Sequence, residues 1–343
     1  MTSEARARAE IDRLLTAAGW HVCDYKAADI HAARGVALRE FELTVGHGTA
    51  DYLLYLDGKA AGVIEAKKTG ATLTGVERQS ARYTQGLPST LPAWARPLPF
   101  AYESTGVETH FTNGLDPEPR ARNVFAFHRP ETLSGWLEPL QARVHDAERP
   151  EGRPATFLAR LQHMPPLVTE WGDHKLWPAQ ITAIRNLEAS LAQNKPRALI
   201  QMATGSGKTF TAISSIYRLI KFAGARRVLF LVDRGNLGRQ AKKEFDQYVS
   251  PVNNYKFGEE YIVQHLASNQ LDKTARVCIS TIQRMYSMLK GRELPEEADE
   301  ESTERVESLF KEPEAHATTP KPGRSCLVAL FKYCDPQAKG LLS

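Results

Sequence analysis

Cysteine is scarce in this chain, and long apolar runs are absent. The four cysteines, Cys23, Cys278, Cys326 and Cys334, form no Cys-x-x-Cys pair. This spacing argues against a zinc cluster and a disulfide framework, and it fits a reducing compartment, so we predict a cytoplasmic protein. The opening stretch MTSEARARAEIDRLL carries charges every few positions, and no run approaches the length of a membrane span. We therefore expect neither a signal peptide nor a membrane partner.

A strong excess of one charge sign is also missing. The 343 residues contain 44 Lys and Arg against 40 Asp and Glu, a net charge of +4. This balance permits nucleic-acid binding without requiring it. Hydrophobic residues make up 42% and charged residues 24%, which is typical of globular proteins, and the length allows two domains.

The first region, residues 1–150, has the pattern of a mixed α/β domain. Helical spacing of apolar residues predicts a helix over residues 4–20 with Gly19 as a C-terminal cap. Strand periodicity follows over residues 37–68, interrupted by the hairpin signal Asp57-Gly58. A helix over residues 72–87 and strands near residues 99–106, 107–114 and 123–129 complete the pattern. Residues 151–174, in a stretch rich in Pro, Gly and charge, are predicted to form a linker.

The second region, residues 175–300, alternates apolar strands with helices. Strands are predicted at residues 197–203, 226–233 and 275–281, and helices at residues 177–193, 208–224, 236–248 and 282–291. This alternation predicts a doubly wound parallel sheet. Residues 301–343 continue an acidic run and then show no strand–helix rhythm, so we expect them to be poorly ordered.

A phosphate-binding loop lies between the first strand and the second helix of this region. In ATGSGKT, residues 203–209, Gly205 and Gly207 let backbone N–H groups point at phosphates, and Lys208 adds a positive charge. Thr209 offers a hydroxyl to Mg²⁺. The strict glycine-rich pattern requires glycine where this chain has Met202. The predicted ATP-binding residues are Gln180, Thr204, Gly205, Ser206, Gly207, Lys208 and Thr209.

The loop in this form resembles that of superfamily 2 helicases and translocases. The resemblance implies that Gln180, in WPAQITAI, reads the adenine base, whereas an exposed helical glutamine is the ordinary alternative. It also implies DNA contacts from VDRGNLGRQ and STIQRM, which lie at predicted strand ends. Ordinary loop and helix-cap chemistry is the alternative there. The predicted DNA-binding residues are Arg234, Gln240, Thr281 and Gln283.

The predicted hairpin around Asp57-Gly58 carries two carboxylates and a lysine. Glu65 and Lys67 are two positions apart and share a face of one strand, and Asp51 lies on the other strand. A two-residue loop would set Asp51 opposite Ile64 and leave Glu65 on the other face. A three-residue loop would place Asp51 opposite Glu65. We expect the second register, because two adjacent carboxylates joined by a cation are typical of a Mg²⁺ site for phosphodiester cleavage.

Further residues support a nuclease-type centre over an ordinary solvated hairpin. Gln79 and Tyr83, in QSARY, share one face of the predicted helix and accompany the catalytic residues Asp51, Glu65 and Lys67. The predicted metal ligands are Asp51, Glu65 and, at the nucleotide, Thr209. Glu10 and Glu40 are weaker candidates for an additional ligand or for backbone support.

A D…ExK hairpin with QxxxY, followed by a superfamily 2 motor, resembles the restriction subunit of type I restriction–modification enzymes. Stretches such as ETHFTNGLDPEPRARNVFAFHRPETL and LFLVDRGNLGRQ carry the same resemblance, over roughly residues 1–300. It implies a restriction-endonuclease-like domain followed by a RecA-like ATP-binding domain. It also implies Mg²⁺, ATP, double-stranded DNA, and partner methyltransferase and specificity subunits, in a complex that pumps DNA and cuts it.

The sequence departs from that family in one element. A motor of this kind needs an apolar strand ending in Asp-Glu-x-His, but the Asp-Glu after Lys208, Asp299-Glu300, follows no apolar strand. We therefore expect a chain truncated by a shifted reading frame, a gene break or an artificial end, which binds ATP without hydrolysing it. Two alternatives stay open, a DNA-repair nuclease–helicase and a non-catalytic remnant that binds DNA or ATP.

Overall fold

The computed structural model describes residues 3–73, 76–145, 156–195, 197–289, 291, 294 and 328–330. Residues 151–155 of the predicted linker, and residues 301–343 apart from 328–330, lie outside this description. The chain divides into two compact units, Met1–Ala159 and Arg160–Ser343, and we treat each by itself. Among the described residues, no helix combines the length and the apolar character needed to cross a bilayer.

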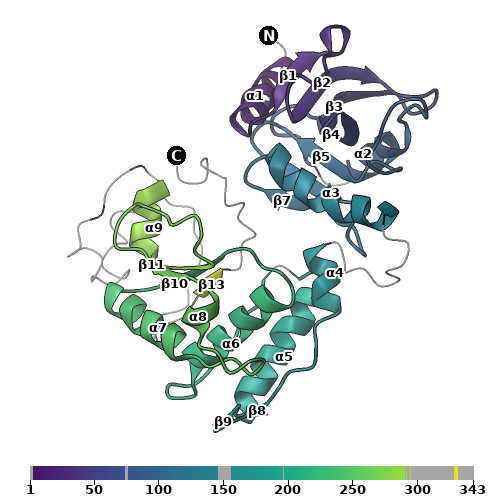
Figure 1. Ribbon diagram of the computed structural model, residues 1–343. Helices are drawn as coiled ribbons and strands as arrows, with labels where there is room; N and C mark the ends of the chain where they lie inside the picture. Colours follow the sequence, from purple (N-terminus) through teal and green to yellow (C-terminus); the bar gives the residue numbers. More distant parts are fainter. Residues whose placement is uncertain are drawn as a thin grey trace. The chain divides into compact units, whose positions relative to one another are not determined.

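The first unit is built on a seven-stranded mixed sheet (Figure 1). Its strands are β1 (His21–Asp24), β2 (Gly35–Glu42), β3 (Thr49–Leu56), β4 (Lys59–Ala66), β5 (Phe100–Ser104), β6 (Thr109–Asn113) and β7 (Arg122–Val124). They lie side by side in chain order. The pairs β1–β2 and β4–β5 are parallel, and the other neighbours are antiparallel. The mixed sheet confirms the predicted fold class.

Helices cover both faces of this sheet. They are α1 (Ser3–Ala17), α2 (Glu77–Gln85) and α3 (Pro130–His145), together with the short 3₁₀ helix η1 (Tyr25–Ala27). Ile11 of α1 packs in one cluster with Leu54, while Tyr83 of α2 packs in another with Leu53. Because successive strand residues point to opposite faces, α1 and α2 cover opposite faces of the sheet.

The first helix of this unit agrees with the prediction from local sequence, whereas α3 was not predicted. Helix α1 ends at Ala17, and Gly19, the predicted C-terminal cap, follows it with a φ of 91°, which favours glycine, and an N–H that donates to the carbonyl of Thr16. No element was predicted over residues 130–145. The signal that could have found α3 is the spacing of Leu133 and Leu137, which lie one turn apart and are both fully buried.

The second unit combines a small sheet with helices on its faces (Figure 1). Its elements are α4 (Phe157–Gln162), β8 (Glu170–Trp171), β9 (His174–Lys175), α5 (Pro178–Ala192), α6 (Lys208–Lys221), β10 (Val228–Val232), α7 (Gly235–Gln247), α8 (Phe257–Glu260), β11 (Val263–His265), β12 (Val277–Thr281), α9 (Ile282–Leu289) and β13 (Val328–Leu330). The sheet order is β11-β12-β10-β13, with β13 antiparallel to β10 and the others parallel. Phe230 of β10, Ile216 of α6 and Phe245 of α7 form part of its core.

The predicted strand over residues 197–203 is wrong. Residues 197–203 have no strand structure and pair with no strand in the described part of the chain. Leu199 is 90% exposed and Ile200 41% exposed. A strand needs a hydrogen-bonded neighbour, and β13 pairs with one side of β10 while β12 pairs with the other. Without a neighbour, the apolar residues that should have been buried face solvent.

Candidate functional site

The turn between β3 and β4 decides between the two-residue and the three-residue loop that the sequence allowed. It has two residues, Asp57 and Gly58, with φ of 48° and 75°, as in a type I′ turn, so Leu56 pairs with Lys59. The expected three-residue connection is therefore wrong. Beyond the turn, however, the register shifts by one residue, because Tyr55 pairs with Ala60 while Leu54 pairs with Gly62. This β-bulge inserts the residue that the longer loop was expected to supply.

The bulge brings the two carboxylates together. Past it, Tyr52 pairs with Ile64, and continuing this register sets Asp51 opposite Glu65. Asp51 Oδ2 accepts a 2.8 Å hydrogen bond from the backbone N–H of Ala66, which fixes Asp51 against the neighbouring strand. Asp51 and Glu65 thus lie on one face, as predicted, but because of a β-bulge and not because of a three-residue loop.

Lys67 and α2 complete the arrangement on the same face. Lys67 Nζ donates to Glu65 Oε1 at 2.6 Å and to Gln79 Oε1 at 3.1 Å. Gln79 Nε2 in turn donates to the Tyr83 hydroxyl at 2.6 Å. A continuous chain of hydrogen bonds therefore joins the four side chains from Glu65 to Tyr83, which the sequence placed on two separate elements.

Glu65 sits in an unfavourable place for a negative charge. Its side chain is only 5% exposed. Burial raises the pKa of Glu65, the nearby Asp51 carboxylate raises it further, and the Lys67 ammonium opposes both effects. An added cation between the two carboxylates would relieve this repulsion.

The donor set fits a magnesium ion. Glu65 Oε2 is buried and has no hydrogen-bond partner among the described residues, although a buried carboxylate oxygen normally has one. A hard divalent cation prefers carboxylate oxygens, and Asp51 and Glu65 supply two carboxylates side by side. No group of three or more His, Cys, Asp or Glu residues suited to a metal occurs in the described part of the chain.

Sequence reasoning missed two side chains at this site. Glu103 of β5 pairs with Glu65 in the parallel β4–β5 register, is fully buried, and accepts a hydrogen bond from the Ser80 hydroxyl of α2. Arg8 of α1 donates to Asp51 Oδ1 at 2.5 Å. The glutamate could have been found as a charge inside an otherwise buried strand, whereas one arginine on an exposed helix face gives no signal. Of the weaker candidates, Glu40 pairs with Arg8 and Glu10 with Arg13.

The nucleotide loop of the second unit has part of the expected geometry. Gly207, with φ of 75°, precedes α6, which begins at Lys208. Gly205 also has a positive φ, of 80°. These conformations favour glycine and orient the loop at a helix N-terminus, where anions bind. Lys208 Nζ donates to the carbonyl of Ala203 at 3.1 Å, so it folds back onto the loop.

Gln180 connects to the same loop through its amide. It is buried at the start of α5, where Oε1 accepts from the Trp177 N–H at 2.8 Å and Nε2 donates to the carbonyl of Ser206 at 3.4 Å. This contact ties α5 to the loop. To read adenine, Gln180 would have to exchange these hydrogen bonds for bonds to the base. Recognition of adenine by Gln180 stays a prediction.

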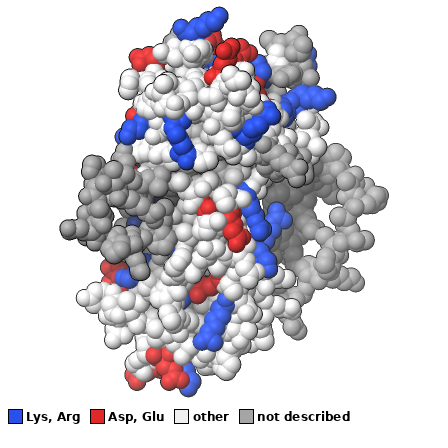
Figure 2. Space-filling view, turned by 90° about the vertical axis from the view of Figure 1, so that its right-hand side faces the viewer, with Lys and Arg blue, Asp and Glu red and all other residues white. Residues whose placement is uncertain are grey.

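The four predicted DNA-binding residues differ in exposure. Arg234 and Gln240 are exposed, near and on α7. Thr281 and Gln283 are buried, and Thr281 Oγ1 accepts from the N–H of Arg284 as a helix cap does. On the face in Figure 2, Lys and Arg side chains are interspersed with Asp and Glu. DNA contact by these residues stays a prediction.

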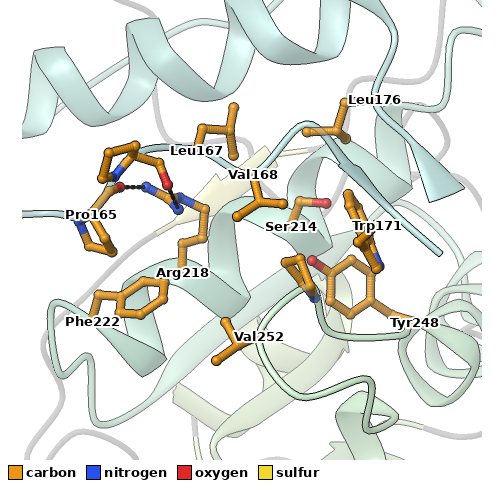
Figure 3. A pocket seen from close by; sticks show the side chains of 12 residues that line it. Pro165, Leu167, Val168, Trp171, Leu176, Ser214, Arg218, Phe222, Tyr248 and Val252 are labelled. Atoms are coloured by element: carbon orange, nitrogen blue, oxygen red, sulfur yellow. Dashed lines mark hydrogen bonds between the residues drawn. The ribbon is translucent and has the colours of Figure 1, made fainter.

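The second unit also contains a small cavity, whose lining includes no residue of the nucleotide loop (Figure 3). It has a volume of about 90 Å³, and its lining is mostly apolar, including Leu167, Val168 and Trp171. Arg218 lines one end, where it donates to the carbonyls of Pro165 and Pro166 and pairs with Glu188 at 2.6 Å. Because every polar group of Arg218 shown there is engaged in holding the unit together, we assign the cavity to packing.

Two protein families match parts of the chain. Residues 18–106 match the second domain of the type I restriction enzyme EcoKI endonuclease subunit, and residues 173–325 match the res subunit of type III restriction enzymes. The first match contains the carboxylate hairpin and α2, and the second contains the nucleotide loop. The second match runs to residue 325, whereas the resemblance to the type I restriction subunit was expected over roughly residues 1–300.

Individual relatives agree with these matches. The EcoKI endonuclease subunit of Escherichia coli K12 is 26% identical over 333 residues, covering 82% of this chain and 27% of that protein. The SauCOLORF180P endonuclease subunit of Staphylococcus aureus COL is 24% identical, covering 70% of this chain and 25% of that protein. This chain thus spans about a quarter of the length of these relatives. A fragment of a putative HsdR subunit from Vibrio vulnificus YJ016 aligns at 17% identity and a TM-score of 0.30, covering 85% of this chain and 49% of that chain.

Proposed function

We propose that this chain, which is related to the endonuclease subunits of type I restriction enzymes, cuts double-stranded DNA in a Mg²⁺-dependent reaction. The observation that carries the proposal is the bulged hairpin, which sets Asp51 beside Glu65 and joins Glu65 through Lys67 to Gln79. An ordinary solvated hairpin would not need a buried glutamate with an unpartnered oxygen.

Each side chain has a distinct role in this proposal. Asp51 and Glu65 would hold Mg²⁺, which, when bound, supplies charge for the scissile phosphate and lowers the pKa of a water. Lys67 contacts Glu65, so it would offset the negative charge there and would orient the attacking water. Gln79 accepts from Lys67 and so limits the directions in which the ammonium can point, while Tyr83 fixes which end of the Gln79 amide faces Lys67.

The second unit is proposed to bind ATP at residues 203–209. The positive φ of Gly205 and Gly207 at the start of α6 supports phosphate binding. We expect weak binding, because the residues before the loop lack strand structure and Lys208 would have to leave the Ala203 carbonyl. We expect no turnover by this chain, because beyond Lys208 no apolar strand of the sequence ends in Asp-Glu-x-His.

The proposed setting is a complex with methyltransferase and specificity subunits in the cytoplasm, in which ATP drives DNA translocation. A requirement for the specificity subunit would separate this proposal from a DNA-repair nuclease–helicase. Metal-dependent nicking by the chain would exclude a non-catalytic remnant.

The test is cleavage of supercoiled plasmid in Mg²⁺, by the chain alone and by the chain mixed with the two partner subunits. Asp51→Asn and Glu65→Gln should each abolish cleavage. Asp57→Asn is the matched control, because Asp57 lies in the same hairpin, pairs with Arg34 at the turn, and should leave cleavage unchanged. Cleavage that persists in both Asp51→Asn and Glu65→Gln would place the catalytic centre elsewhere.

A further inference from the structure

Arg8 reaches the proposed metal site from α1, outside the hairpin and α2. Its guanidinium spans two carboxylates, with Nη2 donating to Asp51 Oδ1 at 2.5 Å and Nη1 donating to Glu40 Oε1 at 2.8 Å. The Asp51 side chain is 12% exposed, that of Arg8 37% and that of Glu40 70%. The guanidinium therefore connects a nearly buried carboxylate to one in solvent.

The backbone of Arg8 is fixed while its side chain has a choice of partner. The neighbouring helix residues Ala7 and Ile11 are buried, and the Tyr52 hydroxyl of β3 lies 3.2 Å from the carbonyl of Arg8. The guanidinium, by contrast, can rotate at the end of a long flexible side chain. It can thus change partner without movement of α1.

An unusual backbone conformation at Glu40 places its carboxylate where it can be the second partner of Arg8. Arg39 pairs with Tyr52 and Phe41 with Ala50, so Glu40 is level with Asp51 on the adjacent strand. Glu40 has a φ of 53°, in the left-handed region that residues other than glycine rarely adopt. Such strain is found where the surrounding structure holds a residue in place, often at functional sites.

Both oxygens of Asp51 are engaged in this arrangement. Oδ2 accepts from the Ala66 N–H and Oδ1 accepts from Arg8. A divalent cation shared by Asp51 and Glu65 would lie within a few ångströms of the guanidinium, where like charges repel strongly. The metal and Arg8 therefore compete for Asp51.

We infer that Arg8 is the resident counter-ion of this site, which neutralises Asp51 when the metal is absent and transfers to Glu40 when the metal binds. This inference rests on the proposed metal site and adds a residue of α1 to it. Arg8 holds Asp51 in place before loading, at the cost of weaker metal affinity. Glu40 has the opposite effect, because it draws the guanidinium away from Asp51.

The test is calorimetric titration of the full chain with Mn²⁺, without DNA. Arg8→Gln should bind Mn²⁺ about tenfold more tightly than the unmodified chain, because the competing charge is gone. Glu40→Gln should bind several-fold more weakly, roughly the scale of one partly exposed ion pair. Arg8→Lys, which keeps the charge, should stay within about twofold. Arg13→Gln is the matched control on the same helix, since Arg13 pairs with Glu10, and should leave affinity unchanged.

The outcomes separate the inference from the proposed function. If Asp51→Asn abolishes Mn²⁺ binding but Arg8→Gln leaves affinity unchanged or weakens it, the counter-ion role is overturned and the metal site stands. If the unmodified chain does not bind Mn²⁺, or if Asp51→Asn binds it equally well, both the counter-ion role and the proposed metal site are overturned. Circular dichroism of each variant checks that α1 and the sheet remain folded, and the opposite signs expected for Arg8→Gln and Glu40→Gln exclude a general loss of structure as the cause.

Discussion

The two candidate sites differ in how much of their support is present in the described structure. In the first unit, the side chains of Glu65 on β4, Lys67 just after it, and Gln79 and Tyr83 on α2 form one hydrogen-bonded chain beside Asp51, next to a seven-stranded sheet. In the second unit, the nucleotide loop has the expected glycine geometry, but the residues before it are not in a strand and Leu199 is 90% exposed. A motif can therefore keep its local conformation although the residues directly before it are not in a strand.

The difference shows which interactions each site needs. The hairpin gains its neighbours within a short stretch of chain, because β3, β4 and α2 follow one another and β5 comes soon after. The nucleotide loop depends on a strand whose neighbour must come from elsewhere in the sheet. We expect substitutions in the first site to change the rate of DNA cleavage. Substitutions in the residues before the nucleotide loop should have little effect on the free energy of unfolding.

The largest effect is expected from Lys67→Ala. Loss of the ammonium that contacts Glu65 should lower the rate of plasmid cleavage by about 10² to 10³-fold, the usual scale for a positioned catalytic group. Metal affinity should not fall, because a positive charge near the cation has been removed. Lys68→Ala, at the exposed neighbouring position, is the control. Equal losses in the two variants would contradict a specific role for Lys67.

Acid should destabilise the first unit through His128. Burial lowers the pKa of His128 to about 4 from 6.5, and its Nδ1 pairs with the Tyr102 hydroxyl at 2.7 Å. Between these pH values the unfolded chain binds a proton that the folded unit does not, so stability falls as pH falls from 6.5 towards 4, by about 2 to 3 kcal/mol. Hydrogen exchange read on peptides of the first unit measures this loss. His128→Gln should make the stability of the first unit depend less on pH. His31→Gln, at an exposed histidine, is the control and should not have this effect. Identical pH profiles for His128→Gln and the unmodified chain would refute the assignment.

A smaller effect is expected from Gln79→Ala. Without the amide oxygen, the Lys67 ammonium keeps Glu65 but gains freedom to point elsewhere, so cleavage should slow by roughly tenfold. Tyr83→Phe should slow it less, because it removes only the group that orients the amide. Mn²⁺ affinity should be unchanged in both. A loss of metal binding in Gln79→Ala would mean that the helix supports the ligands themselves.

The smallest effect is expected from Leu199→Ser in the second unit. Since this side chain is 90% exposed, the change should alter the free energy of unfolding by less than about 0.5 kcal/mol. Leu219→Ala, at a buried position of α6, should cost about 2 to 5 kcal/mol by comparison. Urea unfolding followed by hydrogen exchange compares the two. A large cost at Leu199 would show that residues 197–203 are a buried strand after all.

Local patterns predicted much of the fold and of the first site. Helix α1 with its Gly19 cap, the Asp57-Gly58 hairpin, and the shared face of Gln79 and Tyr83 follow from spacing and turn chemistry alone. The bulge between Tyr55 and Leu54 could not be predicted, because a one-residue insertion in a ladder depends on how both strands pack.

Contacts between distant segments account for the other misses. Arg8 meets Asp51 because α1 packs on the sheet, and Glu103 meets Ser80 because α2 covers β5. The absence of strand structure at residues 197–203 has the same origin, since an apolar run becomes a strand only when a partner strand is available.

The most direct test of the account is the anomalous scattering of Mn²⁺ in crystals of this chain. We predict one peak within bonding distance of the Asp51 and Glu65 carboxylates, with Lys67 still in contact with Glu65 and Gln79, and loss of that peak in crystals of Glu65→Gln. A peak at other residues, or one between Asp51 and residue 65 that is undiminished in Glu65→Gln, would contradict the assignment of this hairpin as the metal-dependent catalytic centre.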